Sequence, residues 1–412
     1  MAFTEGNANV NLKFNVDIVD LKINKPTFSG DILLKDATLN YKPKDITFQK
    51  TNIQLNFTEN GLTIDEIKYT NQNNTVLLKG QIDNFFALYY NDSGKMTVNW
   101  DIYSPSFDAQ QFIVMLAKNK KTTPVKKVSK KMVSAKLQSM IDNSLVNIDI
   151  KADKMVYKNL TATSLTTSIQ LDNGQLFVKN GLIKTCDGNI SFNAQLIPKN
   201  NLYNFNAATN IKTVDIPKFL TAFNNFGIIS FQPNDIKGSM TIIASLSGAM
   251  TQTGTLVENS LNSKVNYNVV NGSLDNFEPL MKVGKVAFKN RDLKNIDFED
   301  LKGQFVVDGE LITVDNFKVS SSVLNFDVKG VYSFGRGTNL AMTIPLRNPK
   351  DDYKITDSIQ RADLRYKGVV LHLFAVDGPD GKIQIKLNPQ DEKASNEIKI
   401  SNPFKKSKST KQ

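Results

Sequence analysis

The chain has 412 residues, a formal net charge of +11 and a hydrophobic fraction of 40%. This composition supports a packed interior, and a mean hydropathy of -0.29 excludes a protein that is mostly embedded in a membrane. The single cysteine, Cys186, excludes an internal disulfide and a cysteine-based zinc site, and the single histidine, His372, excludes most metal sites and most acid–base catalysis.

The first predicted unit spans residues 1–117. Residues 10–50 alternate apolar and polar side chains, which is the pattern of half-buried β-strands. Residues 51–82 contain two further runs of this kind, and Asn60-Gly61 between them is a tight-turn signal. The segment therefore predicts antiparallel strands joined by short loops.

Residues 118–145 form a basic linker followed by a helical piece. The stretch Lys118–Lys131 holds seven lysines and no acidic residue. It has no arginine and no interleaved aromatic residues, so we predict no nucleic-acid partner. We interpret it as a solvated loop, with binding to anionic lipid head groups as the alternative. The tail, residues 390–412, is polar and lysine-rich without periodicity and is predicted to be disordered.

The second predicted unit spans residues 146–262, and the third, with the closing strands, spans residues 263–389. In the third unit, Asp308-Gly309 predicts a hairpin turn, and Asp315-Asn316 predicts a second turn. The following strand places the side chains of Leu324, Phe326 and Val328 on one face. Residues 301–334 therefore read as four short strands.

The same pattern occurs three times, in residues 51–82, 166–196 and 301–334, with Asn173-Gly174 as the turn of the middle copy. The intervals between the copies differ, so the pattern indicates a recurring β unit with variable insertions rather than a strict repeat. The alternative is that any antiparallel meander with Asn-Gly and Asp-Gly turns has this appearance.

The helical signals lie between these copies. Residues 108–118, 215–223 and 276–288 each carry a narrow apolar stripe, and Asp215 with Pro217 is a typical helix start. Such short helices usually lie across an end or a face of a sheet. A membrane-surface role is the alternative, which the absence of a lysine-rich face disfavours.

No motif of catalytic chemistry is present. His372 lies in an apolar predicted strand, Gly335-Arg336-Gly337 is a turn, and the carboxylates form no diagnostic pair. The sequence also lacks a glycine-rich phosphate loop and a dinucleotide fingerprint. We therefore expect a protein that is not an enzyme, with no cofactor and no metal.

The expected fold class is mainly β, an elongated, curled antiparallel sheet with a groove, built from the recurring units and a few short helices. Such a sheet must hide its apolar face by closing on itself, by packing on a second sheet or by curling into a trough. In a trough that side chains fill incompletely, the inner face would suit acyl chains. The candidate lipid-groove residues are Val76, Leu78, Ile190, Phe192, Leu324, Phe326 and Val328.

The chain resembles the C-terminal region of the AsmA-like family over residues 10–388. The resemblance rests on the recurring units, on the segment VDIPKFLTAF and on the closing block ITDSIQRADLRYKGVVLHLFAVDGPDGKIQIKL, which is similar to Bacteroidetes-type members in particular. These AsmA/TamB-type proteins belong to the bacterial cell envelope, so the resemblance implies a periplasmic β groove. It also implies an inner-membrane anchor upstream of this chain.

The resemblance implies that the protein moves phospholipid or another acyl lipid between the inner and outer membranes and supports outer-membrane assembly. Outer-membrane assembly proteins are then further partners. The alternative is a scaffold that regulates outer-membrane protein assembly, or protein targeting to the membrane, without carrying lipid. A glycan-binding β protein is a third hypothesis, which a single tryptophan disfavours.

Overall fold

A computed structural model shows a mainly β protein with mostly antiparallel strands and short helices, which confirms the predicted fold class. The structure describes residues 2–16, 18–19, 22–23, 27–41, 46–71, 74–85, 95–110, 144–228, 231–251, 254–277, 280–281, 288, 291–298 and 301–387. The chain forms two compact units. Unit 1 comprises Met1–Thr185, Ile190–Ala207 and Met250–Thr255, and unit 2 comprises Cys186–Asn189, Ala208–Ala249 and Leu256–Gln412.

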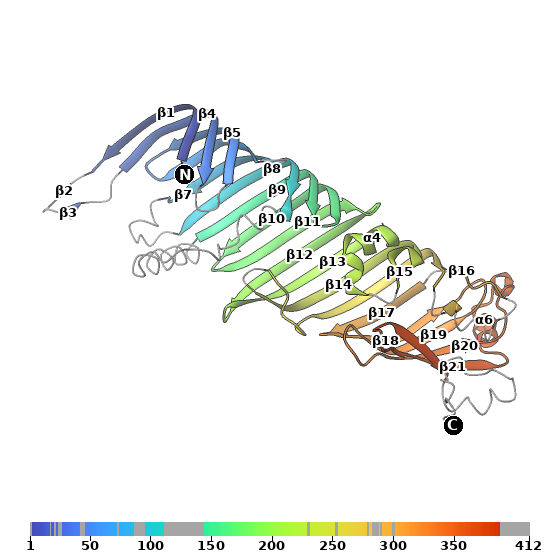
Figure 1. Cartoon of the computed structure of the whole chain (residues 1–412). Helices are drawn as coiled ribbons and strands as arrows, with labels where there is room; N and C mark the ends of the chain where they lie inside the picture. The colour runs from blue at the N-terminus through green and yellow to red at the C-terminus, as the bar shows by residue number, and fades with distance from the viewer. Residues whose placement is uncertain are drawn as a thin grey trace, which may run out of the picture. The chain divides into compact units, whose positions relative to one another are not determined.

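Unit 1 is a sheet of long strands that lie side by side (Figure 1). Its strands are β1 (Ala2–Asn15), β4 (Thr27–Tyr41), β5 (Ile46–Phe57), β6 (Gly61–Asn71), β7 (Asn74–Asp83), β8 (Met96–Asp108), β9 (Ser144–Tyr157), β10 (Leu160–Asp172), β11 (Gln175–Thr185) and most of β12 (Gly188–Lys199). Two short strands, β2 (Ile18–Val19) and β3 (Lys22–Ile23), pair with each other. Neighbours from β1 through β4 to β8 pair antiparallel, as do β9, β10 and β11.

The pairing of β8 with β9 is parallel. Two parallel neighbours need a long connection, because the chain must return to the end of the sheet at which the first strand began. Residues 109–143 provide that length. Most of the predicted basic linker and of the predicted helix over 108–118 therefore belongs to this connection, and both lie largely outside the described residues.

The strands of unit 1 are bent by β-bulges. Asp36, Lys50, Ser164 and Asn180 have φ values of 49°, 48°, 54° and 54°, and each coincides with a shift in strand register. An extra residue in one strand bends it and increases the local twist. These bulges explain why the sheet is curled rather than flat.

Unit 2 contains a second run of antiparallel neighbours. It runs through β14 (Ile236–Thr251), β15 (Asn262–Asp275), β17 (Leu301–Asp308), β18 (Leu311–Val319), β19 (Phe326–Ser333), β20 (Asn339–Pro345), β21 (Val370–Asp377) and β22 (Ile383–Leu387), with β16 (Asn295–Phe298) also beside β15. The strand β13 (Leu202–Asp215) contributes to both units. Among the described residues, unit 2 contains the helices α4 (Ile216–Ala222) and α6 (Ser358–Arg365) and the 3-10 turns η2 (Asn224–Gly227), η3 (Pro233–Asp235) and η4 (Asp352–Lys354).

Unit 2 has a filled hydrophobic core. Leu280, Ile296, Leu324 and Ile344 are at most 2% exposed, and they belong to one cluster of buried residues. The helix α4 adds Ile216 to this cluster. Close packing of this kind leaves no open apolar surface inside the cluster.

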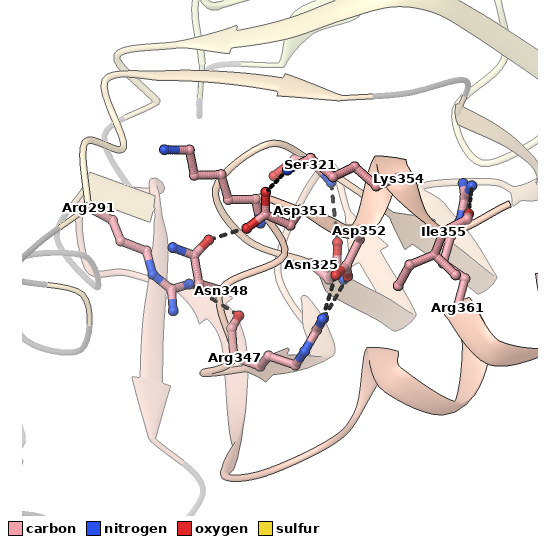
Figure 2. A network of polar contacts seen from close by, with 11 residues as sticks. Arg291, Ser321, Asn325, Arg347, Asn348, Asp351, Asp352, Lys354, Ile355 and Arg361 are labelled. Atoms are coloured by element: carbon pink, nitrogen blue, oxygen red, sulfur yellow. Dashed lines mark hydrogen bonds and ion pairs between the residues drawn. The ribbon is translucent and has the colours of Figure 1, made fainter.

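Polar contacts fasten the loops around this core (Figure 2). The half-buried Arg291 donates to the carbonyl of Val323 at 2.9 Å, and Arg347 forms a two-pronged ion pair with Asp352 at 2.6 and 2.5 Å. Arg361 donates to the carbonyl of Ile355 at 3.0 Å. These arginines satisfy loop carbonyls and a carboxylate, so the network has a structural role.

The hairpin predicted at Asn173-Gly174 is confirmed, and so is the one predicted at Asp308-Gly309, although its turn residues are Gly309 and Glu310 because Asp308 pairs with Leu311. The predicted helix start is also confirmed, because the backbone N–H of Lys218 donates to the Asp215 carboxylate at 2.9 Å and α4 follows. The second turn predicted at Asp315-Asn316 is wrong. These residues lie inside β18, where the register shifts between Val314 and Phe317, so the extra residue forms a bulge instead of reversing the chain.

The third predicted helix, over 276–288, and the predicted disordered tail, over 390–412, lie mostly outside the described residues. Both, like the predicted domain boundaries, stay predictions.

Candidate functional site

One face of unit 1 carries a continuous row of apolar side chains. The row crosses eight consecutive hydrogen-bonded strands, and its members are direct cross-strand neighbours: Ile32, Leu55, Ile64, Gly80, Trp100, Ile148, Ile169 and Val178. We call these residues the apolar strip. Cross-strand neighbours share a face of the sheet, so the strip is unbroken apart from the missing side chain at Gly80.

Two further apolar rows lie beside the strip on the same face. One comprises Leu34, Ile53, Ile67, Leu78, Ile102 and Ile150, and the other comprises Phe57, Leu62, Ile82, Val98, Val146, Leu171 and Leu176. The apolar surface is therefore three residues wide along the strands. Side chains alternate between the two faces along each strand, and where a bulge interrupts the alternation, as between Ile64 and Ile67 on β6, the residues of each row are still direct cross-strand neighbours.

The opposite face of the same strands is polar. Asn147 donates to Asn99 at 2.9 Å, Gln170 donates to Asn147 at 3.2 Å, and Lys179 donates to Gln170 at 2.8 Å. Nearby, the hydroxyl of Tyr103 donates to the Asp153 carboxylate at 2.6 Å, and this bond raises the pKa of Tyr103. The sheet of unit 1 thus has one solvated face and one apolar face.

The apolar strip is covered unevenly. Ile64 is 4% exposed, whereas Leu55, Trp100, Ile148 and Ile169 are half-buried. The fully buried residues packed beside them, Leu62, Ile64, Ile82 and Val98, form a cluster much smaller than the core of unit 2. The strip therefore keeps apolar surface that its own neighbours do not fill.

Trp100 stands near the middle of the strip, on β8. Its cross-strand neighbour on β7 is Gly80, so the ring has no side chain opposite it on that side. The indole Nε1 is buried and has no hydrogen-bond partner among the described residues. A buried donor without a partner costs free energy, and an acceptor that reached it would recover that cost.

The predicted lipid-groove residues fall in different surroundings. Val76 and Leu78 lie on β7 on the apolar face of unit 1, and on β12 Ile190 is buried and Phe192 is half-buried. The ring of Phe192 packs over Gly181, where an added Cβ would lie 2.4 Å from the ring. Leu324 and Phe326 belong to the filled core of unit 2, and Val328 packs against it.

Trp100, Ile148 and Ile64 are central members of the strip that sequence reasoning did not single out. The signal was present, because the segments VNWDIYS and VNIDIKA alternate apolar and polar residues strictly. What the sequence did not provide was the parallel register that places Trp100 opposite Ile148.

The described residues contain no group of three or more His, Cys, Asp or Glu side chains that is placed to hold a metal ion. Within the same residues, no helix has both the length and the apolar character needed to cross a bilayer. His372 lies exposed on β21, opposite Thr343, and Cys186 is half-buried. These two side chains belong to unit 2, whereas the strip belongs to unit 1.

Fold and site together define a class of mainly β protein in which one curled sheet has a polar face and a partly open apolar face. No protein-family model, curated protein or solved structure matches this chain. The resemblance to AsmA-like proteins therefore stays a prediction.

Proposed function

We propose that the apolar strip binds acyl chains and that the protein is a non-enzymatic cell-envelope protein of AsmA type. In this proposal it carries phospholipid, or another acyl lipid, between the inner and outer membranes and supports outer-membrane assembly. The observation that carries the proposal is the continuity of the strip over eight strands with half-buried side chains. A continuous apolar row favours a lipid ligand over a filled core.

The size of the strip fits this ligand. Seven inter-strand spacings give a row roughly 34 Å long. One acyl chain spans about half of a bilayer's hydrocarbon core, or roughly 15 Å. The row is thus long enough for two acyl chains end to end, or for one chain to slide along it.

A second function is favoured by the filled core of unit 2. Because its apolar residues are already packed against one another, unit 2 offers surface loops rather than an apolar site. This supports the alternative of a scaffold that regulates outer-membrane protein assembly, or protein targeting to the membrane, without carrying lipid.

Trp100 is the only tryptophan of the chain, so its fluorescence reports on the strip alone. We expect phospholipid with brominated acyl chains to quench it, and lipid to co-purify with the protein by mass spectrometry. The variant Ile148→Gln places an amide beside Trp100 and should reduce the quenching at least about fivefold. Asp149→Gln introduces the same side chain on the adjacent, exposed position of the polar face and should leave the quenching unchanged.

Thermal melts establish that both variants fold. If brominated lipid fails to quench Trp100, or quenches the two variants and the parent chain equally, the lipid proposal is wrong and the scaffold function is favoured.

A further inference from the structure

The strand β1 is an open edge of unit 1. It pairs with β4 from Ala2 to Asn15, with register shifts on both sides of Glu5, and within the part of the chain that the structure describes its other edge has no partner strand. β1 is 14 residues long and contains no proline. Long strand edges are templates for pairing with another strand. By contrast β22, which has one partner strand in unit 2, has 5 residues.

The apolar face of unit 1 continues onto β1, where its side chains are more exposed to solvent. Val10 is 56% exposed, Leu12 is 39% exposed and Phe14 is 63% exposed, whereas Ile32, the neighbour of Val10 on β4, is half-buried. These side chains are exposed because β1 has a neighbour on one side only. A strand added at this edge would bury them and extend the apolar surface.

The side chains on the polar face of β1 indicate which strand could pair with its open edge. The row reads Glu5, Asn7, Asn9, Asn11, Lys13, and all five residues are exposed. This row is complementary to itself in the antiparallel sense. When the row is reversed about Asn9, Glu5 faces Lys13, and Asn7 faces Asn11. A parallel, in-register arrangement would instead place Glu5 beside Glu5 and Lys13 beside Lys13 of the second copy, and like charges in direct contact are destabilising.

We propose that β1 pairs antiparallel with β1 of a second copy of this chain, centred on Asn9. Two ion pairs then form, each between Glu5 of one copy and Lys13 of the other, and the asparagine amides between them hydrogen-bond across the junction. On the opposite face Ala8 lies beside Val10 of the second copy. The apolar rows of the two copies therefore join into one.

This pairing does not depend on lipid, so it can fail while the proposed function holds, and the reverse is also true. The first test is the oligomeric state of the full chain in lipid-free buffer, measured by sedimentation over a range of concentrations. We expect a dimer whose dissociation constant rises about tenfold in either Glu5→Lys or Lys13→Glu, because both ion pairs are replaced by repulsion. The double variant with both substitutions should restore the parent affinity, since the charges are then exchanged.

The second test measures the register. In a Cys186→Ser background, Asn9→Cys should form a disulfide-linked dimer on mild oxidation, because the two Cα atoms of an antiparallel pair lie within disulfide reach. Lys13→Cys in the same background should not, because its partner position is Glu5. Melting curves confirm that each variant is folded. A monomer at all concentrations, a dimer insensitive to the charge exchange, or crosslinking at Lys13→Cys but not at Asn9→Cys would each overturn the proposal.

Discussion

Asn52 on β5 accepts, through its side-chain Oδ1, the backbone N–H of Asp36 on β4 at 2.9 Å. Asp36 is the bulge residue of β4, with φ of 49°, so its N–H lies outside the regular ladder. Asn193 on β12 accepts the N–H of Asn180, the bulge residue of β11, at 2.8 Å. In both cases a side chain of the next strand replaces the missing ladder bond and holds the bend of the sheet.

We therefore expect Asn52→Ala to lower the free energy of unfolding by about 0.5–1.5 kcal/mol, the net contribution of one hydrogen bond. The measurement is chemical denaturation followed by circular dichroism. Asn56→Ala, at an exposed position on the same strand, is the control and should change the free energy by less than about 0.5 kcal/mol. Equal effects of the two substitutions would show that Asn52 does not hold the bulge.

Arg365, in α6, joins the closing block to the core of unit 2. Its guanidinium pairs with Asp327 on β19 and also donates to Ser320 Oγ at 2.7 Å and to the carbonyl of Val319 at 3.0 Å. The side chains of Arg365 and Asp327 are 11% and 19% exposed. Removing one partner of such a pair leaves the other charge buried, so Arg365→Met should lower the free energy of unfolding by about 3 kcal/mol.

The matched control is the exposed ion pair between Lys354 and Asp351, whose side chains are 62% and 73% exposed. Solvent screens this pair, so Lys354→Ala should leave the melting temperature unchanged. A double variant, Arg365→Met with Asp327→Leu, removes both buried charges and should recover most of the stability. If Arg365→Met melts with the parent chain, the closing block is not anchored by this pair.

Much of the fold followed from the sequence, because alternation and Asn-Gly or Asp-Gly turns depend on local chemistry. The bulges did not. At Asp315-Asn316 the residues favour a turn, yet the strand continues because its neighbours on both sides hold it in the sheet. The parallel pairing of β8 with β9 could not be predicted from the sequence either, because the register between distant strands depends on packing and not on either strand alone.

The sequence predicted the type of candidate site, an apolar face of a sheet, but only some of the residues that form it. Leu78 lies in a row of the apolar surface, as expected from alternation. Leu324 and Phe326 show the same alternation, but loops and helices cover them in unit 2. Alternation reveals which face of a strand is apolar. It does not reveal whether that face is filled, because this depends on segments distant in the chain.

Tyr267 on β15 predicts a pH dependence of stability. Its hydroxyl is buried without a hydrogen-bond partner among the described residues, and burial raises its pKa from an ordinary value near 10 to about 12. The folded state thus holds this proton more tightly than the unfolded state. The resulting stabilisation is present below pH 10 and is lost as the pH rises from 10 to about 12.

Because the ring is partly solvated, we expect this loss to be at most about 2 kcal/mol. Denaturation curves at pH 9 to 12 should show a smaller decline for Tyr267→Phe than for the parent chain. At pH 8 the same variant should be as stable as the parent, because it removes a hydroxyl that has no partner. Parallel declines for the two proteins would exclude Tyr267 as the cause.

A substitution at Phe326 distinguishes the role of the filled core of unit 2 from the role of the apolar strip. It is 5% exposed within the core of unit 2, so Phe326→Ala should lower the free energy of unfolding by about 3–5 kcal/mol through the cavity that it creates. Below its melting temperature, however, this variant should retain the quenching of Trp100 by brominated lipid, whereas Ile148→Gln should lose the quenching with a smaller effect on stability. Each variant is therefore expected to affect mainly one of the two measured quantities, the free energy of unfolding or the quenching of Trp100. Loss of lipid quenching in Phe326→Ala while the protein remains folded would place the lipid site in unit 2 instead of on the strip.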